Sequence, residues 1–278
     1  MSRIETLAAP VCVGLDPVVD RLPDCLRDGS EPIAAILDFS LGVLEAVAGH
    51  TPCVKLQSAC YERYGPAGIQ VLFECITKAE QLDLEVILDF KRGDIGISAQ
   101  HYAEAAYRDT STQPSWVTAS PYLGADGFDP FVRPDRGAFV LVRTSNPSGD
   151  AIQEMKLEGG GTVAEAVGAY VAKAGEASVG ARGYSAIGAV VGATKPEAAA
   201  RLREIMPDQL FLVPGFGAQG GGADDVKPCF KSDGTGALVT ASRSVIYAFD
   251  SRDDDWQGKI SEAAKKLADQ VGVIAGLR

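Results

Sequence analysis

The sequence predicts an α/β protein folded as a single-domain (β/α)8 barrel, and three observations support this prediction. Short apolar runs alternate with longer amphipathic stretches eight times along the chain. The 278 residues suit one such barrel, which typically takes about 250 residues. The two glycine-rich passages, 158–162 and 215–222, resemble loops inside one domain covering residues 1–278. The alternative is an open doubly wound sheet, which is weakened because no G-x-G-x-x-G follows the first strand.

The apolar runs predict eight strands, because a parallel strand buried on both faces is continuously apolar. These runs occupy residues 11–15, 53–56, 85–89, 116–119, 138–142, 186–191, 210–213 and 238–240. The intervening stretches repeat apolar residues at helical spacing. They predict helices over residues 32–48, 68–82, 95–107, 162–177, 195–206 and 256–271, with a short helical piece near 126–132.

Composition excludes several classes of function. The net charge of −11 argues against a nucleic-acid partner, because phosphate backbones require a basic face. No apolar run reaches the length of about 20 residues that a membrane helix needs, and the N-terminus does not resemble a signal peptide. The six cysteines form no C-x-x-C pair and only two histidines are present, so neither a zinc site nor a disulfide is expected. We therefore expect a cytoplasmic protein.

Charged residues cluster where the third strand ends, in the stretch V-I-L-D-F-K-R-G-D-I-G-I-S over residues 86–98. Alternation along an extended chain would place Asp89 and Lys91 on the same face. Asp94 follows at the predicted start of a helix. A purely structural interpretation is also open, in which Asp89 and Lys91 form an ion pair and Asp94 caps the helix.

Polar residues recur at the ends of the other predicted strands, where the active site of such a barrel is built. They include Asp16, Lys55, Ser145, the glycine-rich passage 214–222 and Arg243. Some of them have ordinary alternatives, since Asp16 precedes a proline in a possible turn and Lys55 could simply be ion-paired. Loops after strands seven and eight often bind phosphate, which favours that role for Gln219 and Arg243.

Taken together, these motifs resemble those of the orotidine 5′-phosphate decarboxylase family, over nearly the whole chain. The matching motifs are G-L-D-P after strand one, the lone lysine on strand two, D-F-K-R-G-D after strand three, P-G-F-G-A-Q-G-G after strand seven and R-S-x-x-Y-A at Arg243. The K-R-G-D-I-G form and the P-Y-L-G at residues 121–124 resemble the longer bacterial subfamily, often called type 2.

The resemblance implies roles for individual residues. A charged array of Lys55, Asp89, Lys91 and Asp94 would be catalytic, and the substrate would be orotidine 5′-phosphate, with UMP as product. The residues implied in substrate binding are Asp16 and Lys55 for the ribose, Ser145 for the pyrimidine edge, Pro214 and Gly215 in the glycine-rich loop, and Gln219 and Arg243 for the 5′-phosphate.

The resemblance also implies a homodimer in which Asp94 and Ser98 enter the partner subunit's site. Three departures from the family pattern stand out. Ser98 replaces a threonine but keeps a hydroxyl, and Ser242 replaces a glycine whose N–H commonly touches the phosphate. The T-A-S-P before Tyr122 also differs from the commoner V-N-P.

No cofactor motif is visible, so the implied reaction must rely on preorganised charge. Lys91, between two carboxylates, is the expected proton donor to the C6 carbanion. Asp89 would lie near the departing carboxylate, and both ground-state repulsion and transition-state complementarity remain open explanations.

Three alternative functions remain open at this stage. One is a metal-dependent sugar-phosphate lyase or epimerase, because related barrels also use D-x-K-x-x-D. A second is a Schiff-base aldolase using Lys55 or Lys91. The third is a non-catalytic barrel that senses UMP, which an interrupted charged array would favour; here all four charges are present.

Overall fold

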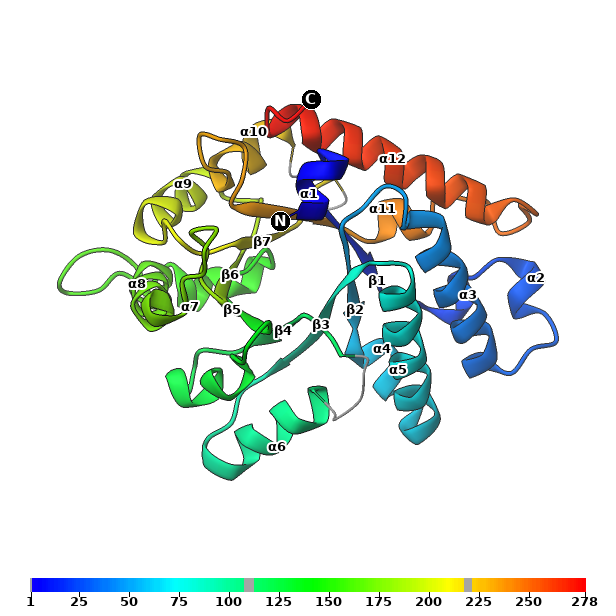
Figure 1. Ribbon diagram of the computed structural model, residues 1–278, viewed down its shortest axis with the longest axis horizontal. Helices are drawn as coiled ribbons and strands as arrows, with labels where there is room; N and C mark the ends of the chain where they lie inside the picture. The colour runs from blue at the N-terminus through cyan, green and yellow to red at the C-terminus, as the bar shows by residue number, and fades with distance from the viewer. Residues whose placement is uncertain (1, 108–112, 218–221) are drawn as a thin grey trace.

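The fold is a closed barrel of eight parallel strands in sequential order, surrounded by helices (Figure 1). The computed structural model describes residues 2–107, 113–217 and 222–278. The strands are β1 (Val11–Leu15), β2 (Cys53–Gln57), β3 (Glu85–Arg92), β4 (Trp116–Ala119), β5 (Gly137–Arg143), β6 (Ile187–Val191), β7 (Phe211–Pro214) and β8 (Ala237–Ala241). The predicted (β/α)8 class is therefore confirmed, and the open sheet is wrong because β8 pairs with β1.

The strands are almost completely buried because the barrel interior covers one face and the helices cover the other. Cys12, Cys53 and Phe139 belong to the interior cluster, whereas Val13 and Val54 belong to the larger cluster between the barrel and the helices. Both faces therefore select apolar side chains, which explains why the strands read as unbroken apolar runs.

The long helices lie where the amphipathic stretches predict them. They are α3 (Pro32–Val47), α5 (Gly65–Gln81), α6 (Gly96–Ala106), α8 (Val163–Gly175), α9 (Pro196–Ile205) and α12 (Trp256–Ile274). Local signals define several ends: Thr162 and Glu165 form a capping box at α8, and Pro196 stands in the first turn of α9. The rings of Phe39 and Trp256 stack with centroids 5.5 Å apart and join α3 to α12.

The N-terminal helix α1 (Ser2–Leu7) lies beside the C-terminal end of α12 (Figure 1). The guanidinium of Arg278 donates to the carbonyl of Leu7 at 2.7 Å. Ile4, on α1, packs into the interior cluster. Among the described residues, no helix is long and apolar enough to cross a membrane.

Short elements and some boundaries differ from the sequence-based expectation. The short α-helices are α2 (Asp24–Arg27), α4 (Ser58–Glu62), α7 (Asp150–Gln153), α10 (Ala223–Val226) and α11 (Arg243–Ile246). The 3-10 turns are η1 (Val19–Arg21), η2 (Ala125–Gly127), η3 (Asp129–Phe131), η4 (Pro147–Gly149), η5 (Glu176–Ser178) and η6 (Lys227–Cys229). One-turn elements carry no periodic pattern, so hydrophobic spacing does not reveal them. The helical piece expected near 126–132 is the pair of turns η2 and η3.

Strand β3 continues three residues beyond the expected end at Asp89. Its pairing with β4 shifts register between Leu88 and Arg92, and Lys91 has a φ of +46°. The extension is therefore irregular, and simple alternation of side chains does not describe it.

Candidate active site

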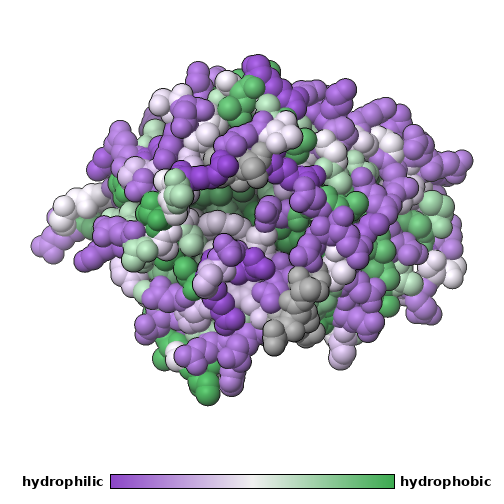
Figure 2. Space-filling model, viewed as in Figure 1, coloured by the Kyte–Doolittle hydropathy of each residue, from purple (hydrophilic) through white to green (hydrophobic). Residues whose placement is uncertain are grey.

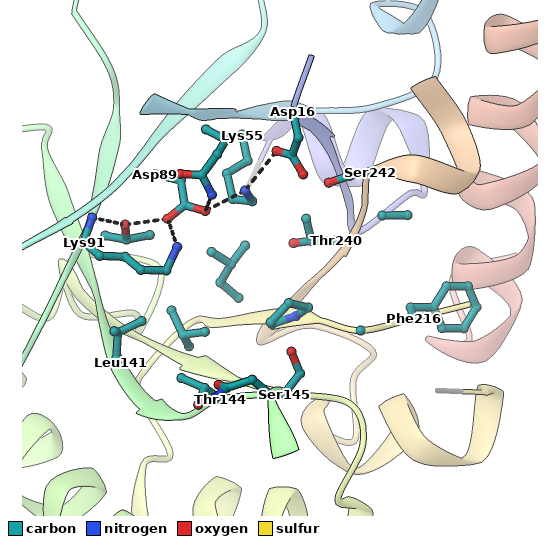
Figure 3. A pocket seen from close by; sticks show the side chains of 18 of the residues that line it. Asp16, Lys55, Asp89, Lys91, Leu141, Thr144, Ser145, Phe216, Thr240 and Ser242 are labelled. Carbon is teal, nitrogen blue, oxygen red and sulfur yellow. Dashed lines mark hydrogen bonds and ion pairs between the residues drawn. The ribbon is translucent and has the colours of Figure 1, made fainter. Parts of the chain in front are cut away.

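A cavity of about 300 Å³ opens at the carboxyl ends of the strands. Residues of strands β2 to β8 and of the loops after β1, β5, β7 and β8 line it, and Figure 3 labels ten of them. The sequence-predicted residues that line it are Asp16, Lys55, Asp89, Lys91, Ser145, Pro214, Gly215 and Arg243. The barrel thus brings together residues on or just after six strands, which are up to 227 positions apart in the sequence (from Asp16 to Arg243).

The Asp89 carboxylate is the centre of the charged array. One of its oxygens accepts hydrogen bonds from Lys55 Nζ at 2.6 Å and Gln57 Nε2 at 3.2 Å. The other accepts from Lys91 Nζ at 2.6 Å and Thr118 Oγ1 at 2.8 Å. Because all four donors converge on one buried carboxylate, the positions of the two ammonium groups are set relative to each other.

The opposite charges within the array keep Asp89 and Lys55 ionised, although burial of each side chain favours its neutral form. Burial alone would raise the pKa of Asp89, but the ammonium groups of Lys55 and Lys91 lower it to about 2. Burial alone would lower the pKa of Lys55, but Asp89 and then Asp16 raise it well above its usual value. At neutral pH, Lys55 and Asp89 are therefore both charged.

The lowered pKa of Asp89 predicts an acid-sensitive contribution to stability. A carboxyl group with a lower pKa in the folded chain than in the unfolded chain stabilises the fold above the unfolded pKa. For Asp89 that contribution is about 2 kcal/mol and is lost as the pH falls from 3.8 to about 2. We expect the gap in unfolding free energy between the wild type and Asp89→Asn, measured by urea titration, to shrink over this interval. A gap that stays constant down to pH 2 would contradict the assignment.

Lys91 adopts an unusual backbone conformation to reach Asp89. Its φ of +46° lies in the left-handed region. For a residue other than glycine, this backbone conformation costs a free energy of about 1–3 kcal/mol. Its backbone N–H donates to Thr118 Oγ1 at 3.0 Å, so β4 helps to hold the turn. Such strain is concentrated at functional sites, where the surrounding structure enforces it.

The loop that carries Asp16 is held by Tyr247, the tyrosine of the R-S-x-x-Y-A motif. Its hydroxyl donates to the Asp16 carbonyl at 3.0 Å and accepts from the Val18 N–H at 2.9 Å. The Asp16 carboxylate lies 3.8 Å from Lys55 Nζ. Tyr247 therefore links the end of α11, the helix that begins at Arg243, to the loop after β1.

The loop that carries Ser145 is held by Arg143, whose side chain is fully buried at the end of β5. Its guanidinium bonds to Asp150 at 2.5 Å, to Gln153 at 3.0 Å and to Glu154 at 3.1 Å. Gly192 permits the close approach of this loop, because a Cβ there would lie 2.9 Å from the Ser145 backbone.

The opposite end of the cavity is formed by Pro214, Gly215, Phe216 and Arg243. Among the described residues, no hydrogen bond or ion pair engages the Arg243 guanidinium. Ser242 fits beside β1 because Gly14 has no side chain: a Cβ on Gly14 would lie 1.9 Å from Ser242 Oγ. Gln219, expected to bind phosphate, lies outside the described residues.

Asp94 and Ser98 lie apart from this cavity. Asp94 accepts a hydrogen bond from the Ile95 N–H at 2.8 Å, and Ser98 is exposed on α6. Neither residue lines the cavity of its own chain. The charged array within the described chain therefore runs Asp16–Lys55–Asp89–Lys91.

Three polar residues that line the cavity from within the strands were not identified from the sequence: Gln57, Thr118 and Thr240. Each stands on an inward-facing position of its strand, two residues beyond another inward side chain such as Lys55, Trp116 or Leu238. The period of two along a strand could have identified them. Among the described residues, no three His, Cys, Asp or Glu side chains are grouped to hold a metal ion.

The fold and the site define a (β/α)8-barrel enzyme with a buried carboxylate between two lysines at the carboxyl ends of its strands. The chain belongs to the orotidine 5′-phosphate decarboxylase / HUMPS family, whose profile matches residues 9–254. It is 41% identical to the orotidine 5′-phosphate decarboxylase of Rhodopirellula baltica, over 94% of this chain and 93% of that one. The enzyme of the same name from Deinococcus radiodurans is also 41% identical, over 96% and 93%.

A solved structure has the same fold. The OMP decarboxylase of Leishmania donovani superposes with a TM-score of 0.78 at 30% identity, covering 98% of this chain and 96% of that chain. The resemblance inferred from the motifs is thereby confirmed at the level of the family.

Proposed function

We propose that this protein decarboxylates orotidine 5′-phosphate to UMP, a step of pyrimidine biosynthesis. The observation that carries the proposal is the Lys55–Asp89–Lys91 array, with both ammonium groups 2.6 Å from one buried carboxylate. Relatives at 41% identity that bear the name of this activity support it.

The reaction needs charge stabilisation and one proton. The bond between C6 and the carboxylate carbon breaks, CO2 leaves, and the electron pair remains on C6. Lys91 then donates its ammonium proton to C6, giving UMP, and regains a proton from water. Preorganised ammonium groups stabilise the developing negative charge without reorganising during the reaction.

The remaining cavity residues bind the nucleotide. Asp16 and Lys55 bind the ribose hydroxyls, and Ser145 hydrogen-bonds the pyrimidine edge. Pro214, Gly215 and Arg243, together with Gln219 as implied by the family resemblance, bind the 5′-phosphate. This assignment fits the cavity, because Ser145 and Arg243 follow the different strands β5 and β8 and both line it.

The protein acts as a homodimer in which Asp94 and Ser98 reach the partner subunit's site. Apolar side chains exposed around these two residues support this interface. They are Ile95, Ile97 and Tyr102 on or beside α6, and Tyr122 and Leu123 after β4. Figure 2 shows hydrophobic side chains gathered at the lower edge of the molecule, over the start of α6. An exposed apolar cluster of this kind is typical of an interaction surface.

Residues 1–278 form one barrel domain of the type 2 subfamily, supported by the K-R-G-D-I-G motif. The protein resides in the cytoplasm, where cysteines stay reduced; all six cysteines are free thiols.

The metal-dependent alternative is not favoured, because the two oxygens of the Asp89 carboxylate already accept hydrogen bonds from Lys55 and Lys91. A Schiff-base aldolase and a UMP sensor are likewise not favoured by the named relatives.

The direct test is the ultraviolet absorbance of orotidine 5′-phosphate mixed with purified protein and excess EDTA. We expect the substrate band to disappear with UMP as product, at the same rate with and without EDTA. Turnover that stops on chelation would favour a metal-dependent reaction instead. Tight UMP binding without turnover would favour the sensor.

A further inference from the structure

We propose that the Thr240 hydroxyl binds a ribose hydroxyl of the nucleotide, as a third sugar-binding group beside Asp16 and Lys55. This inference rests on the proposed function and extends it to a residue outside the sequence motifs. It begins from an unsatisfied hydroxyl inside the cavity.

Thr240 is an exception among the buried threonines of the described chain. Its exposed fraction is 5%, yet Oγ1 has no hydrogen-bond partner there. The other three buried threonines are all bonded: Thr51 donates to Val11 O at 3.0 Å, Thr118 donates to Asp89 at 2.8 Å, and Thr162 accepts from the Glu165 N–H at 3.2 Å. Buried polar groups are nearly always paired, so the free hydroxyl points to a ligand.

The position of Thr240 identifies which part of the ligand it faces. On β8 it is paired in register with Cys12 of β1 and Pro214 of β7. It shares the inward face of the strand with Leu238, and in Figure 3 its hydroxyl projects into the cavity on the side of Asp16 and Ser242. Arg243, at the phosphate-binding end of the cavity, follows three residues later in the chain. Thr240 therefore lies between that end and the ribose-binding pair, Asp16 and Lys55.

A second unpartnered atom lies just after the neighbouring strand β1. Asp16 Oδ1 is buried without a hydrogen-bond partner in the described chain, and Lys55 Nζ at 3.8 Å is too distant to be one. The three groups are chemically complementary to a vicinal diol: Asp16 accepts, Lys55 donates, and a threonine hydroxyl does both. A ribose placed among them would satisfy both unpartnered atoms at once.

The test compares Thr240→Val, which removes the hydroxyl at nearly constant volume, with Thr240→Ser, which retains it. Calorimetric titration would measure the Kd of each for UMP, 2′-deoxy-UMP and 3′-deoxy-UMP. We expect Thr240→Val to weaken UMP binding about tenfold, as for a lost hydrogen bond, and Thr240→Ser to restore most of it. The loss should vanish with one of the two deoxy nucleotides, because that nucleotide lacks the bonded hydroxyl.

The matched control is Thr51→Val, which removes a buried and fully bonded hydroxyl below the cavity. It should lower stability without changing the Kd for UMP. Unchanged UMP binding by Thr240→Val, or an equal loss with all three nucleotides, would overturn the inference alone. A wild-type protein that neither turns over the substrate nor binds UMP would overturn the proposed function as well.

Discussion

Replacing Lys91 by alanine is expected to reduce kcat by about 10⁴-fold or more, because the proton donor and one stabilising charge are lost together. UMP binding should persist, since the groups that bind ribose and phosphate stay in place. Steady-state absorbance assays would measure kcat, and calorimetric titration would measure the Kd for UMP. Asp89 keeps its bonds to Lys55 and Thr118 in this variant, so the array is not left without a cation.

The matched control is Lys259→Ala, because that side chain lies on α12 and is 47% exposed. It should leave both constants unchanged. If Lys91→Ala turned over the substrate at the wild-type rate, Lys91 would not be the proton donor. If it bound no UMP and melted at a much lower temperature, its role would be structural.

Replacing Arg243 by alanine should lower kcat/KM about 10³-fold, because a bidentate, charge-assisted contact to the phosphate is lost. The guanidinium has no hydrogen-bond partner among the described residues, so its removal should leave the fold intact. Guanidinium ion added to the assay should restore much of the lost rate by occupying the vacated space. Initial rates over a range of guanidinium concentrations would measure this rescue.

Two comparisons make the Arg243 experiment specific. Guanidinium should not rescue Lys91→Ala, whose defect is a missing proton donor. Arg201→Ala, on the exposed face of α9, should behave as the wild type. A small loss in Arg243→Ala, or a loss that guanidinium leaves unchanged, would argue against phosphate binding by this residue.

Much of the fold could be predicted because each barrel strand is buried on both faces. The run at residues 11–15 is continuously apolar and forms β1 without change. The third strand was predicted less well, since residues 90–92 include two cations and yet continue β3. Their extended pairing depends on β4 and on the Thr118 hydroxyl, which local composition does not reveal.

The candidate site was predictable to the extent that its residues stand at strand ends. Asp16, Lys55, Asp89 and Ser145 all line the cavity as the barrel topology required. Thr118 and Thr240 were not identified, because a threonine inside an apolar run is common in buried strands. The structure shows the importance of both residues. The Thr118 hydroxyl donates to the Asp89 carboxylate, whereas the Thr240 hydroxyl has no partner in the described chain.

The sequence by itself determined the α/β class, the positions of the strands along the chain and the strand ends that carry chemistry, because periodicity and strand ends are local properties of the chain. Only the tertiary structure decided that Asp89 is shared by Lys55 and Lys91 at 2.6 Å each. It also decided that Gly14 makes room for Ser242. These arrangements depend on distances between residues far apart in the chain, which closure of the barrel sets and no local pattern encodes.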